Sequence, residues 1–422
     1  MPSYYHATAD AGTRFAPLAG RHDAQVVVVG GGYAGLATAF SLLDRGAARG
    51  CLVLEADTLG HGASGRNGGF VFGGFSLDSA ELLRQRGREE ARALYRMTQQ
   101  AVDRIRVRIE RHGIACDAVH AGVLLANWFG DDAPLRAVQR LMHDAFDVEW
   151  RWLPRDETRA LLVSELYHAA LHEANAFHFN PLKYALGEAR VLQAGGVGVH
   201  ERSRVRAITA EGAGWRVETD AATVRCRHVA VCCGGYIGRL VPALARAAMP
   251  IATYVMTTEP LGERLRDAMR TPAAVYDTRF AFDYYRPLAD TRLVWGGRIS
   301  VRDRSPADVQ RLLLADLLRV YPQLRGVRVE HAWSGLMSYA RHKMPQVGRL
   351  PSGLWYAMGF GGHGVAPTTL AGEVLAAAIT GEAPVPPGLA AYGLRPTYGL
   401  LGRAAAQASY WWYQAADAWR GR

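Results

Sequence analysis

Lysine is almost absent from this chain. Lys183 and Lys343 are the only two lysines among 49 basic residues, and the other 47 are arginines. The formal net charge of +10 would suit a nucleic-acid-binding protein, but the arginines are spread among acidic residues and form no run of five or more like charges. The sequence therefore predicts no nucleic-acid partner.

Cysteine is scarce as well. The five cysteines are Cys51, Cys116, Cys226, Cys232 and Cys233. Most of them lie in apolar runs, and no C-x-x-C or H-x-x-x-H arrangement offers metal ligands. These features predict reduced core thiols and no metal site.

Long apolar runs are missing too. The chain has no run of 18 apolar residues, and its first residues lack the apolar core of a signal peptide. With 49% hydrophobic and 21% charged residues, the composition is typical of a packed, soluble enzyme, expected in the cytoplasm. Membrane association is not expected. The aromatic segment 410–419 leaves one alternative open, a helix at a membrane surface, but a helix packed on the protein is favoured.

A complete strand–helix–strand unit opens the folded part of the chain. Residues 25–29 form a β-branched run typical of a buried parallel strand, a helix is expected from about 32 to 45, and residues 51–55 predict a second strand. Such a unit implies a right-handed crossover and a parallel sheet.

A dinucleotide fingerprint lies within this unit. Gly30, Gly32 and Gly35 form the pattern G-x-G-x-x-G. Their roles would be a tight turn, close approach of a pyrophosphate, and close packing of the helix on the sheet, with the phosphates at the helix N-terminus. Glu55 ends the next strand, where a carboxylate accepts ribose hydroxyls and repels a 2′-phosphate. The pattern predicts NAD or FAD and disfavours NADP.

Two further glycine-rich segments favour FAD over NAD. The segment GASGRNGG, residues 62–69, exposes backbone amides that suit an anion or a flavin edge, although a plain surface loop is the alternative. The segment MGFGGHGV, residues 358–365, follows a predicted strand and opens a helix that ends near Gly381. A second helix N-terminus would stabilise the negative charge of a reduced flavin, which nicotinamide does not carry.

The rest of the chain mixes two kinds of structure. A long amphipathic helix is expected over 89–112, and Ser305 begins another helix with proline at its first position. Residues 122–127, 251–258 and 280–298 predict antiparallel strands, whereas 228–233 and 354–358 predict parallel ones. We expect an α/β (α+β) fold, with a Rossmann-like FAD-binding domain and a discontinuous antiparallel-sheet substrate domain.

These motifs resemble the glycine/D-amino-acid oxidase (DAO) family of FAD enzymes, and within it the gamma-glutamylputrescine oxidases. The resemblance covers nearly the whole chain; it is carried by VVVVGGGYAGLATAFSL, GASGRNGG, FNPLKYALGEA, TTEPL, DYYRPLADTRLVWGGR, KMPQVGRL and GFGGHGV. It implies FAD-dependent oxidation of the C–N bond of a small amine or amino-acid derivative to an imine and then a carbonyl compound, with O2 reduced to hydrogen peroxide.

The sequence departs from the wider family at three points. Leu336 or Met337 stands where covalent members carry a flavin-bearing cysteine, so the resemblance implies dissociable FAD. The segment RLVWGGR lacks the lysine that sarcosine-oxidising relatives use for oxygen activation, which puts oxidase behaviour in question. The segment FVFGGFS is richer in Phe and Gly than is expected for gamma-glutamylputrescine oxidases, which favours a different and more apolar substrate.

Site residues and domains follow from these motifs. The expected domains are FAD-binding, residues 1–85, 180–250 and 330–400; substrate-binding, 86–179 and 251–329; and a C-terminal helix, 401–422. The cofactor-binding candidates are Gly30, Gly32, Tyr33, Ala34, Gly35, Glu55, Ala56, Ser64, Gly65, Arg66, Asn67, Gly68, Gly69, Val205, Gly234, Gly361, Gly362, His363, Gly364 and Val365. The substrate-pocket candidates are Phe72, Tyr254, Tyr284, Tyr285, Arg298, Met337 and His363.

Each substrate candidate has a structural alternative. The aromatic residues fit a strand core equally well, and Arg286 or Arg298 would either bind a carboxylate or form a surface ion pair. Two other functions also stay open: a dehydrogenase that passes electrons to a quinone or another carrier, and a flavin-binding protein without turnover. No nucleophile elbow or catalytic triad is present, which disfavours a hydrolase.

Overall fold

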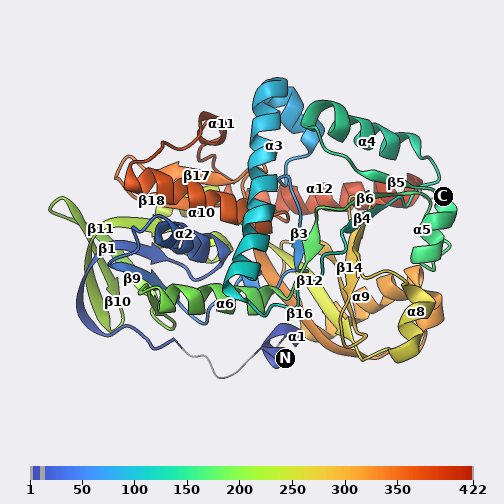
Figure 1. Ribbon diagram of the computed structural model, residues 1–422, viewed down its shortest axis with the longest axis horizontal. Helices are drawn as coiled ribbons and strands as arrows, with labels where there is room; N and C mark the ends of the chain where they lie inside the picture. The colour runs from blue at the N-terminus through green and yellow to red at the C-terminus, as the bar shows by residue number, and fades with distance from the viewer. Residues whose placement is uncertain (1–2, 10–14, 421–422) are drawn as a thin grey trace.

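Two eight-stranded sheets lie side by side in the computed structural model, which describes residues 3–9 and 15–420 (Figure 1). The long helix α3, Ser79–His112, runs across the junction between them. The segments that build the two sheets alternate along the chain, as expected for a discontinuous two-part fold.

The first sheet contains the predicted strand–helix–strand unit. Its strand order is β17-β18-β11-β1-β2-β8, and β10 pairs with β11 and β9. The strands are β1 Gly20–Val29, β2 Cys51–Leu54, β8 Gly198–His200, β9 Val205–Glu211, β10 Gly214–Thr219, β11 Ala222–Val231, β17 Gln346–Arg349 and β18 Trp355–Met358. Strand β1 is parallel to both β11 and β2, and β18 is parallel to β11, as the apolar runs predicted.

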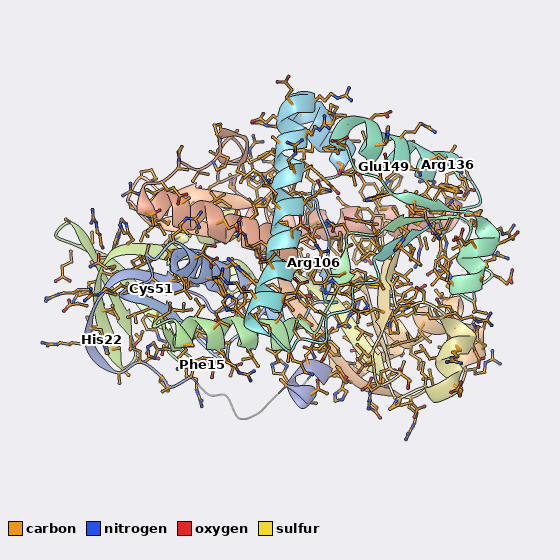
Figure 2. The ribbon with its side chains drawn as sticks, in the orientation of Figure 1. Phe15, His22, Cys51, Arg106, Arg136 and Glu149 are labelled. Atoms are coloured by element: carbon orange, nitrogen blue, oxygen red, sulfur yellow. The ribbon has the colours of Figure 1, made fainter. Side chains whose placement is uncertain are left out.

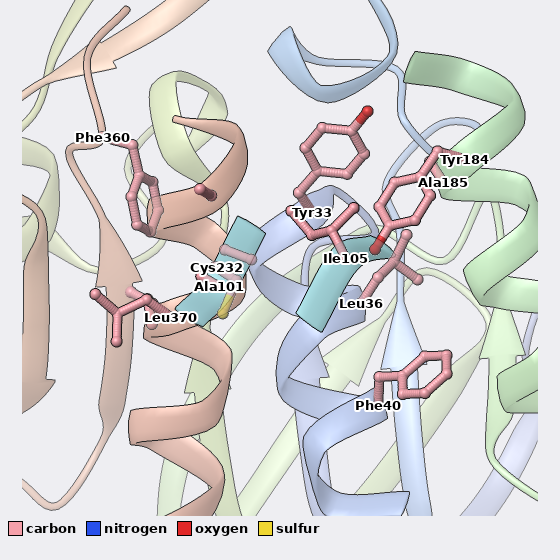
Figure 3. Close-up of a cluster of buried hydrophobic side chains, with 14 of the residues drawn as sticks. Tyr33, Leu36, Phe40, Ala101, Ile105, Tyr184, Ala185, Cys232, Phe360 and Leu370 are labelled. Carbon is pink, nitrogen blue, oxygen red and sulfur yellow. The ribbon is translucent and has the colours of Figure 1, made fainter. Parts of the chain in front are cut away.

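Three helices cover this sheet. Helices α2, Tyr33–Asp44, and α10, Val365–Thr380, lie next to each other, and α6, Pro181–Ala194, lies beside α2 (Figure 1). The close-up shows Leu36 and Phe40 of α2, Ile105 of α3 and Leu370 of α10 in one buried cluster (Figure 3). This apolar cluster fixes the helices on the sheet.

The second sheet is mixed. Its order is β16-β12-β15-β14-β13-β4-β6-β5. The strands are β4 Val123–Ala126, β5 Arg151–Leu153, β6 Ala170–Glu173, β12 Met249–Thr258, β13 Ala274–Asp277, β14 Asp283–Pro287, β15 Leu293–Ser300 and β16 Val329–Tyr339. Strand β4 is antiparallel to β6 but parallel to β13, so the antiparallel prediction for residues 122–127 is right for one neighbour only.

Strand β16 shows where the expected division of the chain and the sheets differ. It pairs along its length with β12 in the second sheet, whereas the expected division assigned residues from 330 onward to the FAD-binding domain. The chain crosses back to the first sheet only at β17.

Helix α3 has clear ends and one interruption. The side chain of Asp78 accepts the backbone N–H groups of Ala80 and Glu81, and Gly113 ends the helix in a left-handed conformation. Gly87 has φ 74° and ψ 170°, so a kink separates the first turns from the helix that was expected over 89–112. Arg106 of α3, labelled near the centre of the view in Figure 2, has its guanidinium 5.3 Å from the ring centroid of Phe177.

The remaining helices lie around both sheets and at the termini. They are α1 Tyr4–Thr8, α4 Ala133–Phe146, α5 Arg155–Leu161, α7 Pro242–Ala247, α8 Leu265–Ala268, α9 Pro306–Val320, α11 Pro387–Ala390 and α12 Gly399–Arg420, with a two-stranded pair of β3 Phe70–Val71 and β7 Phe177–His178. The Ser305 hydroxyl accepts the N–H of Asp308 at the start of α9, as the capping pattern predicted.

Helix α12 turns its polar side chains toward the protein. The side-chain oxygen of Gln407 lies 3.1 Å from the Ser300 hydroxyl, and the Asp417 carboxylate accepts the N–H groups of Phe280 and Ala281. The helix thereby packs against the end of β15 and the loop before β14. Among the described residues, no helix is both long and apolar enough to cross a membrane.

Candidate active site

The turn between β1 and α2 has the geometry that its glycines require. Gly30 has φ +112°, a conformation that residues with a side chain rarely adopt. A Cβ on Gly35 would lie 1.9 Å from the Gly30 carbonyl oxygen, so only glycine lets α2 approach the turn this closely. Gly35 therefore shapes the turn through packing.

Glu55 holds this turn from the next strand. Its carboxylate accepts the N–H of Gly31 at 2.7 Å and the N–H of Asp57 at 2.9 Å. Burial raises the pKa of the Glu55 carboxyl, and the two backbone donors oppose that shift. The side chain thus lines the cavity and orders the glycine turn at the same time.

Helices α2 and α10 begin at the same edge of the first sheet. Both follow strands that run in one direction, since β1 and β18 are each parallel to β11. A Cβ on Gly372 would lie 2.5 Å from the backbone carbon of Ala37, so glycine at this position lets the two helices touch.

The N-cap residues of both helices are glycines, which have no side chain to bond the N–H groups of the first turn. Gly32 and Gly364 are the N-cap residues of α2 and α10, and neither supplies a side-chain hydrogen bond. The Ser64 hydroxyl accepts the N–H of Tyr33, the first residue of α2. The positive ends of two helix dipoles meet in one place, where they favour a negatively charged ligand.

The segment 61–69 closes against this edge. The Asn67 amide donates to the carbonyls of Ala63 and Ser64 and accepts the N–H of Gly69, and the Arg66 guanidinium donates to the His61 carbonyl. These hydrogen bonds hold the loop in its conformation. A ligand would contact the other loop atoms that face the cavity.

A cavity of about 1230 Å³ joins these elements to the second sheet. It exceeds the roughly 300–1,000 Å³ of a site for one small molecule, which leaves room for a dinucleotide and a substrate. The buried hydroxyl of Ser338 on β16 lines the cavity and has no hydrogen-bond partner among the described residues. Such a group needs a partner from a ligand or water. The site therefore fits a flavin dinucleotide.

Most of the candidates from the sequence line this one cavity. From the cofactor set these are Gly30, Gly32, Tyr33, Ala34, Glu55, Ala56, Ser64, Arg66, Asn67, Gly68, Val205, Gly234, Gly361, Gly362, His363, Gly364 and Val365, and from the substrate set Phe72, Tyr284, Arg298, Met337 and again His363.

Three glycines of the cofactor set are not among the lining residues. Gly35 packs against Gly30, as described above. A Cβ on Gly65 would lie 2.5 Å from the Gly60 carbonyl oxygen, and one on Gly69, which has φ +82°, would lie 2.1 Å from the Phe179 carbonyl oxygen. Close backbone packing explains these glycines, in place of the direct ligand contact that the sequence suggested.

Two tyrosines of the substrate set face away from the cavity. Tyr285 is fully buried, stacks on Trp295 at 4.3 Å, and shares hydrogen bonds with the hydroxyls of Tyr167 and Tyr321. Tyr254 donates its hydroxyl to the Arg302 carbonyl and belongs to the same buried cluster. Neighbouring side chains on a strand point to opposite faces, so the cavity faces Thr253 and Tyr284 instead. Tyr254 and Tyr285, predicted to contact the substrate, therefore do not line the cavity.

The arginines expected to bind a carboxylate have other partners. Arg286 is buried and donates to the carbonyls of Gly68 and Phe179, so it ties the flanking loop to β14. Arg298 lines the cavity, but its guanidinium forms two hydrogen bonds with Asp316, at 2.6 and 2.7 Å. Arg298 therefore forms an ion pair, which was one of the two roles considered for it. Arg286 has neither role, because it binds backbone carbonyls and no carboxylate.

His363 is neutral and fixed in the glycine-rich loop. Burial lowers the pKa of its imidazole to about 4. Its Nε2 lies 2.7 Å from the Gly73 carbonyl, so this nitrogen carries the proton and Nδ1 is an acceptor. The ring also meets Phe72 edge-on, with centroids 4.0 Å apart.

Several lining residues were not found from the sequence. They are Phe70, Tyr276, Arg279, Phe282, Cys232, Cys233, Tyr236 and Ser338, together with Gln407, Tyr410 and Tyr413 of α12. The alternation of Phe70 and Phe72 is the one local signal among them. The others need the tertiary fold, because they come from four separate parts of the chain.

Comparisons with known proteins agree with this geometry. Residues 25–378 match the family model described as DAO, FAD dependent oxidoreductase. The chain is 36% identical over 383 residues to the gamma-glutamylputrescine oxidoreductase of Escherichia coli K12, a match that covers 90% of this chain and 89% of the relative. The chain belongs to the DAO family of FAD-dependent oxidoreductases, which act on amine or amino-acid C–N bonds.

Solved structures show the same fold at low identity. A glycine oxidase from Geobacillus kaustophilus superposes with a TM-score of 0.73 at 20% identity, covering 89% of this chain and 99% of that one. An L-proline dehydrogenase from P. horikoshii superposes with a TM-score of 0.72 at 18% identity, covering 88% and 97%. The predicted fold class is confirmed.

Proposed function

We propose that this chain oxidises the C–N bond of a small, gamma-glutamylputrescine-like amine to an imine, which hydrolyses to a carbonyl compound. The observation that carries the proposal is one cavity. It joins helices α2 and α10, each of which begins after a glycine N-cap, to an aromatic wall on the second sheet. The relative from Escherichia coli, whose name gives this substrate, supports the choice of amine.

The residues of the first sheet would hold FAD. Glu55 would accept the ribose hydroxyls, the turn from Gly30 to Gly32 would take the pyrophosphate, and the start of α10 near Gly364 would face the flavin ring. The same helix start would stabilise negative charge on a reduced flavin. When bound, FAD supplies a two-electron oxidant that accepts hydride from the carbon next to an uncharged amine nitrogen.

The chain's own residues position the substrate. His363 stays neutral at physiological pH and fixes the loop through Gly73, so it adds no charge beside the amine. Tyr284 lies against Gly68 and Gly296, where a Cβ would approach its ring to 2.6 and 2.1 Å. Orientation of this kind is the main contribution that a flavoenzyme adds to the cofactor's chemistry.

FAD would be dissociable. Met337 lines the cavity at one of the two positions where the flavin-bearing cysteine of covalent relatives was expected. Cys232 and Cys233 also line the cavity, but burial raises the pKa of the Cys232 thiol to about 12 and that of Cys233 higher still. Because the thiolate is the nucleophile, neither cysteine is activated for attachment.

Two electron acceptors stay as alternatives. Oxygen, reduced to hydrogen peroxide, follows from the family resemblance. A quinone or another carrier is favoured by β15, whose eight residues contain no lysine to activate oxygen. The lysine that lines the cavity, Lys343, lies beyond β16.

Anaerobic photometry tests the proposal. The yellow holoenzyme is mixed with gamma-glutamylputrescine, other N-acylated diamines, N-methyl amino acids and D-amino acids, and the flavin absorbance is followed. Bleaching by the diamine derivatives is expected, and the release of peroxide in air then separates an oxidase from a dehydrogenase. A flavin that no amine bleaches would identify a binding protein without turnover and overturn the proposal.

A further inference from the structure

Five aromatic side chains form a closed circuit in the wall of the cavity. Going round it, the ring centroids of Phe70 and Phe72 are 6.1 Å apart, those of Phe72 and Tyr276 5.8 Å, and those of Tyr276 and Phe282 6.0 Å. Phe282 and Tyr284 follow at 6.2 Å, and Tyr284 returns to Phe70 at 5.7 Å. All five line the cavity. We call them the aromatic ring.

The size of the aromatic ring suits an ammonium group. A regular five-sided circuit with these sides has its centre roughly 5 Å from each centroid, inside the roughly 6 Å at which a cation is attracted to an aromatic face. Phe72 and Tyr276 are stacked at 15°, so at most one of these two rings turns its face to the centre, whereas the other four neighbouring pairs meet at 58–87°. Aromatic faces carry negative electrostatic potential, and several of them around one point recognise alkylammonium ions.

The charges behind the aromatic ring are paired with one another. Arg279 pairs with Asp277 and Asp283, with its Nη2 2.5 Å and 2.6 Å from their carboxylates. Asp277 follows Tyr276, and Asp283 lies between Phe282 and Tyr284. Two buried carboxylates share one guanidinium, so this cluster does not carry excess positive charge. Nε and Nη2 of Arg279 are both taken by these two carboxylates.

The arginines on β14 and β15 are also occupied. Arg286 donates to backbone carbonyls, and Arg298 is paired with Asp316. Arg66 and Arg341 line the cavity elsewhere and donate to His61 and to Tyr398. A carboxylate on the reacting carbon would enter an aromatic wall without a bidentate partner, which costs its hydration.

We propose that the aromatic ring binds the amino group of the substrate, and that the substrate is an alkyl amine without a carboxylate on the reacting carbon. This inference rests on the proposed function and narrows its substrate class. The amine enters as R–CH2–NH3⁺, gives one proton to water, and then loses hydride to FAD, which leaves R–CH=NH2⁺ for hydrolysis. FAD is the oxidant and takes both electrons.

A pair of probes of equal shape tests the aromatic ring in the holoenzyme. Choline and its uncharged isostere 3,3-dimethylbutan-1-ol are titrated separately, and binding is read from the change in flavin absorbance. We expect choline to bind at least about tenfold more tightly, because only the cation gains from the ring faces. Equal binding of the two probes would overturn the inference.

Variants separate a role in cation binding from a role in packing. Phe282→Leu removes one face at a side chain that is 42% exposed, so the fold tolerates it, and should weaken choline binding about fivefold while leaving the isostere unchanged. Phe282→Trp should restore or strengthen choline binding. Tyr285→Phe, outside the cavity, is the matched control. If both probes weaken equally in Phe282→Leu, the side chain only fills space and the inference fails.

The outcome also distinguishes this inference from the function on which it rests. A chain that binds no FAD overturns both. A chain whose flavin is bleached by glycine or D-alanine faster than by butylamine keeps the oxidation and overturns the substrate class.

Discussion

Gly372 of α10 lies against the backbone of Ala37 in α2, so close that a methyl group would stand 2.5 Å from the Ala37 carbonyl carbon. This contact sets the spacing of the two helices whose N-termini open on the cavity. It links a residue well inside α10 to the geometry of the cofactor site.

Gly372→Ala should therefore weaken FAD binding from a distance. The added methyl must push two backbones apart, which costs about 1–3 kcal/mol of unfolding free energy and misplaces both helix starts. Thermal unfolding and a titration of the apoprotein with FAD measure the two effects. Gly130→Ala is the control, since its Cβ would meet only His168, at 3.7 Å. Unchanged FAD affinity in Gly372→Ala would show that the helix spacing is not critical.

Glu55→Gln should lower FAD affinity about tenfold or more, because hydrogen bonds to a charged acceptor contribute roughly 1.5–3 kcal/mol each. The change keeps the shape of the side chain and removes the charge that orders Gly31 and faces the ribose. Glu382→Gln removes an exposed carboxylate paired with Arg45 and serves as control. Equal FAD dissociation constants for the two variants would contradict the role of Glu55.

The buried carboxyl of Glu173 should make the free energy of unfolding depend on pH. It is buried and accepts the N–H of Gly73, and burial raises the pKa of its carboxyl from 4.5 to about 7. Between these two values the folded chain holds a proton that the unfolded chain has lost, so the stability of the wild type falls as pH rises.

Glu173→Gln removes this titration. Relative to the variant, the wild type should lose about 3 kcal/mol of unfolding free energy between pH 4.5 and pH 7 or above, at about 1.4 kcal/mol per pH unit. Denaturant unfolding of both proteins across this pH range is the measurement. A constant difference between them would mean that Glu173 is not protonated in the folded chain.

The hydrogen bonds of Asp417 predict that helix α12 restricts access to the cavity. Its carboxylate accepts the N–H groups of Phe280 and Ala281, on the loop that leads to Phe282. Asp417→Ala should free this loop and raise KM severalfold, while FAD affinity stays as in the wild type. Steady-state kinetics with the best amine give KM, and Glu263→Gln, a change at a side chain that is 92% exposed, is the control. A loss of FAD without a change in KM would place the effect at the cofactor instead.

Local patterns in the sequence predict the cofactor half of the molecule well. The start of α2 at Tyr33, the end of α10 at Gly381, and the turn at Gly30 each depend on a few neighbouring residues, and the structure has all three. The family match confirms the class of enzyme that these motifs suggested.

The substrate half depends on contacts that no local pattern contains. Tyr284 and Tyr285 are adjacent and chemically identical, yet one lines the cavity and the other is stacked on Trp295. Which of them faces inward is set by the phase of β14 in the sheet. The aromatic ring likewise combines the segment around Phe70 with residues some 200 positions later, and only the folded chain brings them together.

A crystal structure of the chain grown with FAD and choline would test the central claim most directly. We predict one FAD with its adenosine at Glu55, its flavin ring beside the loop that contains His363, and the choline ammonium inside the aromatic ring. A flavin ring bound away from that loop would contradict the account. FAD bound anywhere other than this cavity, which lies between the two sheets, would contradict it as well.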